Sequence, residues 1–259
     1  MFYKFLICFI AGAGAGLGTG FAGMSAAAVI SPMLITFLGI EAYQAVGIAL
    51  ASDVLASAIS AFTYGKSKNL DIRNGIAMMI SVLCFTLAGS WAANLLPNSA
   101  MGGFSVSMTV LLGLRFIFKP VMTTKEAMEA VDSKKRLIRS IIGGCSIGFI
   151  CGFIGAGGGM MMLLVLTSFL GYELKTAVGT SVFIMSFTAL TGSLSHFIID
   201  GKMPDIPCLV FCILSTLIWA RIASKIANKA KPITLNRITG GILCALGIAV
   251  LSFNLISKQ

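Results

Sequence analysis

The stretch GFAGMS at residues 20–25 recurs as GFIGAGGG at residues 152–159, and this recurrence determines the fold. A shift of 132 positions aligns residues 12–65 with residues 144–197 without a gap, and 13 of the 54 aligned pairs are identical. Six of the identical pairs are glycines. Self-similarity at a fixed spacing indicates that the chain consists of two related halves.

The composition places this chain in lipid. Of its 259 residues, 57% are hydrophobic and 11% are charged, and the mean hydropathy is +0.97. A soluble domain carries about 25% charged residues, so this chain has too little polar surface to cover a water-soluble particle. The composition therefore excludes a cytosolic enzyme, a secreted disulfide scaffold and a disordered tail.

Uncharged runs give the number of membrane crossings, because about 20 residues of helix span the hydrocarbon core. The three longest runs, of 33 to 41 residues, must contain two segments each. The ten expected segments are 3–20, 24–40, 42–65, 72–95, 99–118, 137–154, 158–172, 174–199, 206–228 and 233–256. The first resembles a secretory signal peptide, but its place in the repeat predicts that it is retained.

The expected fold class is an all-α polytopic membrane protein built from two inverted repeats. Residues 1–118 form the first repeat, residues 119–136 a cytoplasmic linker, and residues 137–259 the second repeat. Each repeat holds five segments, and an odd number means that the second copy enters the membrane upside down. The linker is expected to contain one helical turn, begun by a capping box from Thr123 to Glu126.

Loop charges orient the chain. Of its 19 Lys and Arg residues, sixteen fall on one side of the expected topology, and three, Lys4, Lys202 and Lys258, fall on the other. Cytoplasmic loops collect Lys and Arg, so both termini are predicted outside the inner (plasma) membrane. The net charge of +10 is thus explained by topology. No nucleic-acid partner is expected, because the basic linker has no aromatic side chain on which bases could stack.

Inverted repeats are typical of secondary transporters, whose midplane site lies between matching short or glycine-interrupted segments. Here these segments are residues 20–25 and 152–159, so we expect glycine-broken helices, re-entrant or fully spanning, at the repeat interface. A helix that restarts after such a break presents free N–H groups and a positive dipole end, which suit an anion. Close helix packing is the favoured role of six glycines at and before the starts of these segments: Gly12, Gly16, Gly20, Gly144, Gly148 and Gly152.

The same residues resemble the sulfite exporter TauE/SafE family. The second half carries the better match, with GAGGG at residues 155–159, AVGTS at 177–181, His196 and GKMPD at 201–205. The first half matches more loosely, with GMSAA at residues 23–27, Pro32, AVGIA at 45–49, Tyr64 and NLDIR at 69–73. The resemblance implies a secondary transporter, often an exporter, of small sulfur-containing or organic anions such as sulfite or sulfonates.

The resemblance and the glycine breaks together give a set of candidate site residues. The expected substrate-binding residues are Gly23, Ser25, Gly155, Gly157, Gly158, Gly159, Thr180 and Ser181. Backbone N–H groups near Gly157–Gly159 are expected to donate hydrogen bonds to the anion. The resemblance implies that the hydroxyl groups of Thr180 and Ser181 also bind it. Because the halves differ at these positions, their two half-sites are unequal.

Three further residues are candidates for proton coupling or gating: Asp53, His196 and Tyr64. Asp53 lies near the middle of segment 42–65, where an unpaired charge is unfavourable by at least about 2.5 kcal/mol. It is either a proton-binding residue or a carboxylate held by a residue such as Arg115 or by neighbouring serines. Its repeat partner is Met185, so a proton role would belong to one half only. Glu41 and Glu173, also repeat partners, are expected at helix starts.

No cofactor and no metal site is expected, because the seven cysteines lack metal-site spacing and the chain has one histidine. The expected partners are a small anion, a proton as coupling ion and the lipid bilayer, and a homodimer is compatible with the pattern. Two other functions stay open. One is a passive anion channel, and the other is an intramembrane hydrolase, which the position of the chain's single histidine, His196, near a membrane boundary disfavours.

Overall fold

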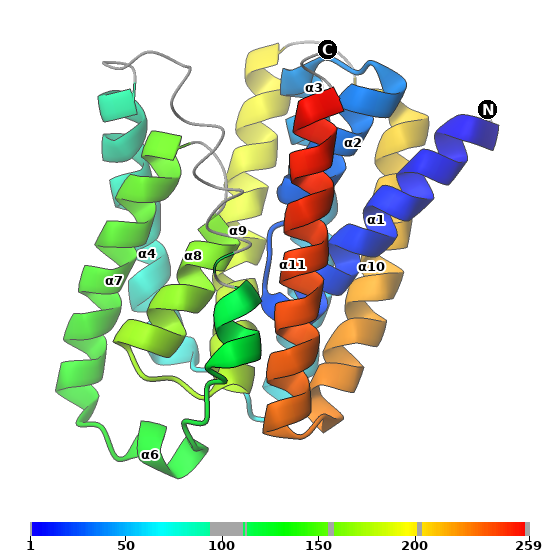
Figure 1. The fold of residues 1–259 in the computed structure, drawn as a ribbon. Helices are drawn as coiled ribbons and strands as arrows, with labels where there is room; N and C mark the ends of the chain where they lie inside the picture. Colours follow the sequence, from blue (N-terminus) through cyan, green and yellow to red (C-terminus); the bar gives the residue numbers. More distant parts are fainter. Residues whose placement is uncertain (1, 94–110, 112, 155–157, 201–203, 257–259) are drawn as a thin grey trace.

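The computed structural model describes residues 2–93, 111, 113–154, 158–200 and 204–256. Within these residues the chain is helical and forms no strand. The elements are α1 (Phe2–Ala22), α2 (Ala27–Leu38), α3 (Ala42–Lys66), α4 (Ile72–Ala93), α6 (Lys125–Glu129), α7 (Ser133–Ile154), α8 (Gly158–Leu164), η2 (Val165–Phe169), α9 (Leu174–Asp200), α10 (Ile206–Lys229) and α11 (Pro232–Ile256). Figure 1 shows their arrangement.

Nine of the ten expected segments coincide with these helices to within a few residues. The fifth, residues 99–118, lies largely outside the described residues, although 113–118 are helical. Among the described residues, the helices long and apolar enough to cross a membrane number five: Phe2–Ala22, Gln44–Lys66, Leu174–Leu194, Ile206–Lys229 and Pro232–Ala249. The chain is therefore a multi-pass membrane protein.

Two segments are too short to cross alone. Helix α2 has 12 residues, and α8 with η2 has 7 and 5 residues. At 1.5 Å per residue each rises only about 18 Å, well short of the hydrocarbon core of about 30 Å. Both end at a glycine with positive φ, Gly39 (63°) and Gly171 (70°), which are 132 positions apart. The half-length segments therefore lie at matching positions in the two halves.

Three helix pairs make the most extensive contacts: α1 with α10, α4 with α7, and α3 with α9. Figure 1 shows α4, α7 and α8 on one side of the molecule and α1, α10 and α11 on the other, with α9 between them. The start of α1 and the end of α11 lie at one end of the bundle, here named the terminal end, and α6 lies at the opposite end, here named the α6 end.

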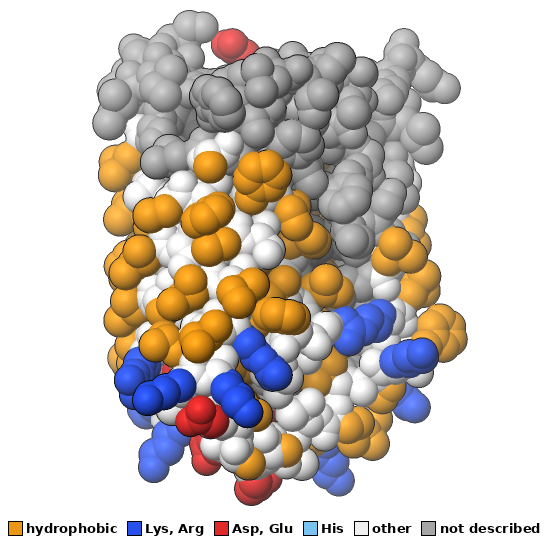
Figure 2. All heavy atoms as spheres, turned by 90° about the vertical axis from the view of Figure 1, so that its left-hand side faces the viewer, with side chains coloured by type: hydrophobic (Ala, Val, Ile, Leu, Met, Phe, Trp, Pro, Cys, Tyr) orange, Lys and Arg blue, Asp and Glu red, His pale blue; other side chains and the backbone are white. Residues whose placement is uncertain are grey.

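The outer surface matches a membrane environment. Exposed apolar side chains include Ile76 and Ile80 of α4 and Ile142 of α7. Figure 2, which looks at the α4 and α7 side, shows apolar side chains over the middle of this face and Lys and Arg below them, toward the α6 end. On this face the described Lys and Arg residues thus gather on one side of the apolar band.

Helix α1 packs on α10, and α7 packs on α4, through glycines. A Cβ atom on Gly16 would lie 2.6 Å from the Thr216 carbonyl oxygen, and one on Gly148 would lie 2.4 Å from the Val82 carbonyl oxygen. Close approaches of the same kind occur at three other glycines, Gly12, Gly20 and Gly144. The packing role expected for these five is confirmed, and the surroundings of Gly152 lie outside the described residues.

The linker contains the expected helical turn, but its cap is shifted by one residue. Helix α6 begins after Thr124, not Thr123, and the Thr124 hydroxyl oxygen accepts a hydrogen bond from the Ala127 N–H at 3.3 Å. Only Thr123 stands three residues before Glu126, the spacing of a capping box, so the pattern favoured Thr123, whereas the observed cap at Thr124 has Ala127 three residues on. Glu41 and Glu173 stand immediately before α3 and α9, as expected for helix starts.

Candidate functional site

A tight turn at Gly23 ends α1 and directs the chain into α2. Gly23 has a φ of +58°, a left-handed conformation that favours glycine. Its N–H donates to the Thr19 carbonyl oxygen at 3.0 Å, and the Met24 N–H donates to the Gly18 carbonyl oxygen at 3.2 Å. The Thr19 hydroxyl in turn donates to the Met24 carbonyl oxygen at 2.8 Å. The turn is therefore fixed by hydrogen bonds of its own.

Asp53 lies directly against this turn. Its side chain is buried, with a relative exposure of 1%. One carboxylate oxygen accepts from the Ser25 hydroxyl at 2.8 Å, and the other accepts from the Ser57 hydroxyl at 2.9 Å. The backbone N–H of Ala26 also donates to the carboxylate. Asp53 thus sits at the N-terminus of α2, where donors and the helix dipole favour a negative charge.

The alternatives for Asp53 are partly resolved by its neighbours. Among the described residues no cationic side chain forms an ion pair with Asp53. Arg115 instead donates to the Ser168 hydroxyl. The carboxylate is therefore held by serines and a backbone N–H, and its charge is not compensated by a neighbouring cation.

The second half reaches the same turn through α8 and α9. A Cβ atom on Gly159 would lie 2.5 Å from the Gly23 carbonyl oxygen and 2.9 Å from the Ser25 backbone nitrogen. A Cβ atom on Gly23 would lie 2.0 Å from the Ser181 hydroxyl oxygen. The structure therefore brings together four of the predicted site residues, Gly23, Ser25, Gly159 and Ser181, in contact with Asp53 through Ser25.

The two halves contribute unequal groups to this centre. Met185, the repeat partner of Asp53, has its sulfur 2.6 Å from where a Cβ on Gly159 would lie. Asp53 thus lies against the Gly23 turn of its own half and Met185 against Gly159 of α8, so the first half supplies a carboxylate and the second a thioether. Gly158 begins α8, and the candidates Gly155 and Gly157 lie outside the described residues.

The remaining candidates lie apart from this centre. The Tyr64 hydroxyl is fully buried and donates to the Gly20 carbonyl oxygen at 2.8 Å, near the end of α1. The Thr180 hydroxyl oxygen accepts from the Asp71 N–H at 3.2 Å, in a different cluster. The backbone of α9 passes through His196, but the side chain of His196 lies outside the described residues.

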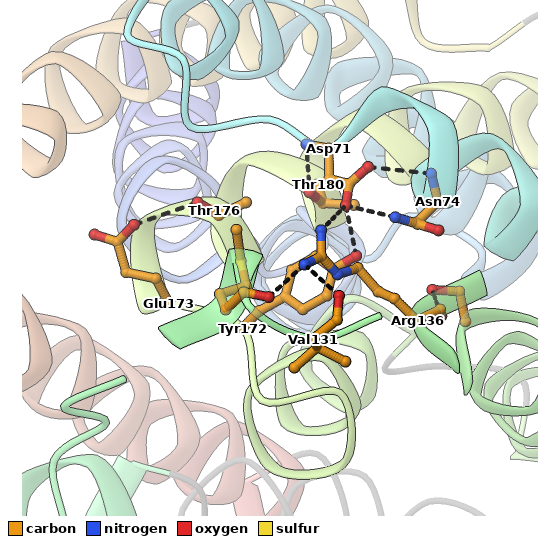
Figure 3. A network of polar contacts seen from close by, with 10 residues as sticks. Asp71, Asn74, Val131, Arg136, Tyr172, Glu173, Thr176 and Thr180 are labelled. Atoms are coloured by element: carbon orange, nitrogen blue, oxygen red, sulfur yellow. Dashed lines mark hydrogen bonds and ion pairs between the residues drawn. The ribbon is translucent and has the colours of Figure 1, made fainter. Parts of the chain in front are cut away.

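The cluster around Asp71 was not predicted from the sequence. Figure 3 shows Asp71 surrounded by Asn74, Arg136, Tyr172 and Thr180. Its carboxylate accepts from the Tyr172 hydroxyl at 2.8 Å and from the Asn74 side-chain amide at 2.7 Å, and it forms an ion pair with Arg136 at 3.8 Å. The sequence offered one indication of this cluster. Arg136 lies 132 positions after Lys4, so the two cations occupy equivalent positions in the two halves.

Metal ligands do not converge anywhere in the described part of the chain, where no group of three His, Cys, Asp or Glu residues could hold an ion. Three buried cysteines do meet between α1 and α10, with the Cys8 and Cys208 sulfurs 3.5 Å apart and Cys212 one turn further along. All six described cysteines are free thiols. Cys8, Cys208 and Cys212 are buried as small apolar side chains, as expected, whereas Cys84 is exposed and Cys145 and Cys244 are partly exposed.

Comparisons with known proteins agree with this architecture. The family model described as "Sulfite exporter TauE/SafE" matches residues 8–250. A probable membrane transporter protein of Methanocaldococcus jannaschii is 26% identical over 248 residues, which cover 91% of this chain and 88% of the relative. One of Bacillus subtilis is 24% identical over 196 residues, covering 71% and 72%, and one of Haemophilus influenzae is 27% identical over 208 residues, covering 78% and 76%. No solved structure gives a significant match.

Proposed function

The chain belongs to the sulfite exporter TauE/SafE family of membrane transporters, and from this premise we propose that it is a secondary transporter of small sulfur-containing or organic anions such as sulfite or sulfonates. In this proposal it acts as an exporter in the inner (plasma) membrane, with both termini outside. A single central site is exposed to the two faces in turn. The family supplies the transporter class, whereas the anion, the direction and the mechanism are inferred from the residues described above.

Two inverted repeats would account for the helix contacts. The shift of 132 relates α1 to α7 and α3 to α9, and the starts of α4 and α10 are 134 positions apart. Exchanging the halves turns the contact of α1 with α10 into that of α7 with α4, and leaves the contact of α3 with α9 unchanged. This pattern supports alternating access, because two similar halves can exchange conformations around a central site.

The glycine contacts support the same relation, because they have the same register in both helix pairs. A Cβ atom on Gly12 would lie 2.7 Å from the Ser215 Cβ, and one on Gly144 would lie 2.8 Å from the Ser81 Cβ. Ser81 and Ser215 are 134 positions apart, as are the starts of the helices that carry them. The two interfaces therefore repeat at the level of single contacts.

The observation that carries the proposal is Asp53. A buried carboxylate without a partner cation is unfavourable inside a membrane, and such residues commonly mark ion or substrate pathways. Asp53 also lies where the glycine turn of the first half meets α8 and α9 of the second. We assign it the role of proton coupling, with Tyr64 and His196 as the candidates for gating.

We propose that the anion binds to the second half of the chain. In the first half the N-terminus of α2 already faces a carboxylate of the chain itself, Asp53. The second half has Met185 at the position that matches Asp53, so the carboxylate that the first half places there has no counterpart in the second. The proposed donors are the backbone at Gly157–Gly159 and the hydroxyl of Ser181, with Gly23 and Ser25 opposite. Gly155 is a further candidate, whereas the Thr180 hydroxyl faces Asp71.

Counterflow in proteoliposomes tests this function. Liposomes containing the purified protein are loaded with unlabelled sulfite and diluted into a trace of radiolabelled sulfite, and the same is done with taurine, sulfoacetate and acetate. A carrier with an alternating site should accumulate the label transiently, because inward movement of the label is coupled to outward movement of the unlabelled anion. Protein-free liposomes give the background.

The Asp53→Asn variant serves as the matched control for coupling, and it should retain counterflow while losing the response to an imposed proton gradient. Label that equilibrates rapidly without transient accumulation would indicate a passive anion channel. Absence of flux for every anion tested, with protein that remains monodisperse, would contradict an anion transporter.

A further inference from the structure

Two ion pairs occupy matching places in the two halves. Lys4 of α1 pairs with Asp205, which precedes α10, and Arg136 of α7 pairs with Asp71, which precedes α4. Lys4 and Arg136 are 132 positions apart, and Asp71 and Asp205 are 134 apart. In each pair the cation lies near the start of the first helix of one half, and the aspartate caps the fourth helix of the other. These are the two ion pairs formed by described residues.

The two aspartates divide their oxygens in the same way. Oδ1 of Asp205 accepts from the Cys208 N–H at 3.2 Å, and Oδ1 of Asp71 accepts from the Asn74 N–H at 3.1 Å. In both residues Oδ2 is the oxygen that pairs with the cation. Each carboxylate therefore caps its own helix with one oxygen and binds the other half of the protein with the second.

The two ion pairs lie at opposite ends of the bundle. Lys4 is in the first turn of α1, at the terminal end, whereas Arg136 is in the first turn of α7, at the α6 end (Figure 1). Between these ends, α1 meets α10 and α7 meets α4 through glycines. At these positions the backbones approach closely, and α1 and α7 insert no side chain of their own into the partner helix.

We propose that Lys4–Asp205 and Asp71–Arg136 are two matching latches, each of which must open to admit substrate from its own end of the bundle. This inference rests on the proposed alternating-access function and adds to it the residues that control each face. Both latches are closed in this structure, and Asp53 and Ser181 at the centre are buried, with exposures of 1% and 0%. Opening of one latch lets the first helix of one half separate from the fourth helix of the other at that end.

The latches differ in strength. The Lys4 and Asp205 side chains are 38% and 24% exposed, whereas those of Arg136 and Asp71 are each 14% exposed. The Asp71 carboxylate also holds the Tyr172 hydroxyl and the Asn74 amide, and Arg136 donates to the carbonyl oxygens of Met128 and Val131. Position 40, which matches Tyr172 in the first half, is an isoleucine. The latch at the terminal end is therefore the one that opens more easily.

Directional labelling of a buried reporter tests the latches without knowledge of the substrate. A Ser181→Cys reporter is placed in a chain whose native cysteines are replaced by serine or alanine. Its reaction with a membrane-impermeant maleimide is followed in right-side-out and inside-out vesicles. Asp71→Asn and Asp205→Asn form a matched pair, because asparagine caps a helix about as well as aspartate does and each change breaks one ion pair. Asp71→Asn also removes the oxygen that accepts from the Tyr172 hydroxyl and the Asn74 amide.

Asp71→Asn should raise the labelling rate from the α6 end about fivefold or more and should not raise it from the terminal end. Asp205→Asn should have the mirror-image effect. Lys4→Gln should reproduce Asp205→Asn, and the double variant should add nothing further, because both changes break one latch. Arg136→Gln bears the same relation to Asp71→Asn.

Two results would overturn the latches. One is an equal rise at both ends in each variant, which indicates general loosening of the fold, and the other is an unchanged rate at both ends in variants that remain folded. A reporter that reacts from neither end in any variant, the parent included, would instead contradict the central pathway and with it the proposed function. Face-specific labelling in a protein that fails every counterflow assay would keep the latches and reject the anions tested.

Discussion

The interface of α1 with α10 and the interface of α7 with α4 have the same packing but different polar ends. Positions four residues apart along α1 are Lys4, Cys8, Gly12, Gly16 and Gly20, and the matching positions of α7 are Arg136, Ser140, Gly144, Gly148 and Gly152. The glycines are shared, whereas the first two positions differ in chemistry. Close backbone contact is therefore the requirement common to both halves, and the residues at the two ends are free to set different strengths.

The difference between the ends follows from their surroundings. At the terminal end Cys8 lies one helical turn after Lys4 on α1, and its sulfur contacts the Cys208 sulfur at 3.5 Å. At the α6 end Ser140 and Tyr172 surround the pair, and the linker helix α6 supplies a carbonyl oxygen to Arg136. One end is thus closed by a single ion pair over apolar thiols, and the other by a network of polar groups.

The largest effects are expected where the two interfaces are alike. Gly16→Ala and Gly148→Ala should each lower the stability by about 1–3 kcal/mol, because the added Cβ meets backbone atoms that cannot move aside. For Gly16 the nearest is the Thr216 carbonyl oxygen at 2.6 Å. Thermal unfolding of the purified protein in detergent would show this as a lower transition temperature.

Gly14→Ala is the matched control on the same helix. Its added Cβ would meet side-chain atoms at 3.5 Å, an ordinary contact, and alanine favours a helix over glycine by about 1 kcal/mol. We therefore expect no loss of stability for Gly14→Ala. A large loss in one interface and none in the other would break the equivalence of the two halves.

The next-largest expected effect is on anion binding, and it distinguishes the proposed anion site from the packing glycines. Gly158→Ala and Ser181→Ala should weaken binding of the transported anion about tenfold to a hundredfold, since each charge-assisted hydrogen bond is worth roughly 1.5–3 kcal/mol. Binding is measured by the anion concentration that gives half-maximal counterflow. Gly144→Ala should instead lower stability and leave this concentration nearly unchanged in the folded protein.

Ser186→Ala controls for the loss of a hydroxyl on α9. Ser186 donates to the Phe183 carbonyl oxygen at 2.7 Å, as Ser181 donates to that of Val178 at 2.9 Å. The Ser186 variant should bind normally because it lies away from the turn. Normal binding by Gly158→Ala together with weak binding by Gly144→Ala would place the anion site at the other glycines.

Asp53 is the residue that makes the two halves unequal at the centre. Its replacement should change the response of transport to a proton gradient, an effect of intermediate size. A pH difference of one unit across the membrane should change the accumulation of a proton-coupled anion about tenfold, and Asp53→Asn should abolish this change. Met185→Leu, at the matching position of the second half, should keep it. Gradient dependence that survives in folded Asp53→Asn protein would return Asp53 to a structural role.

The segments could be predicted from the sequence because the membrane fixes the length of a spanning helix and excludes charged side chains from its interior. Uncharged runs therefore indicated nine segments that the described helices match. The relation between neighbours was harder to predict. Thr180 and Ser181 are adjacent, but a helix turns about 100° per residue, so one hydroxyl meets Asp71 and the other meets Gly23. A motif that names both residues cannot show that they face different clusters.

The ion pairs escaped prediction because their partners are far apart in the chain. Lys4 and Asp205 are 201 positions apart, and no local pattern indicates which helix faces which. Asp53 shows the same limit, because the sequence suggested both Arg115 and neighbouring serines as partners, and only the packing of α2 against α3 selects Ser25. The repeat shift of 132 was the one long-range signal available, and it relates equivalent residues, not touching ones.

The smallest effect is expected at the weaker latch. Lys4→Gln should lower the stability by no more than about 1 kcal/mol, the range for an exposed ion pair, and added salt should remove the difference because it screens such a pair. Arg136→Gln should lower the stability more, because it leaves a largely buried Asp71 carboxylate without its cation. Thermal unfolding at low and high ionic strength compares the two variants. Two outcomes would contradict the stronger latch at the α6 end. One is an equal loss of stability in both variants, and the other is a loss that depends on salt in Arg136→Gln alone.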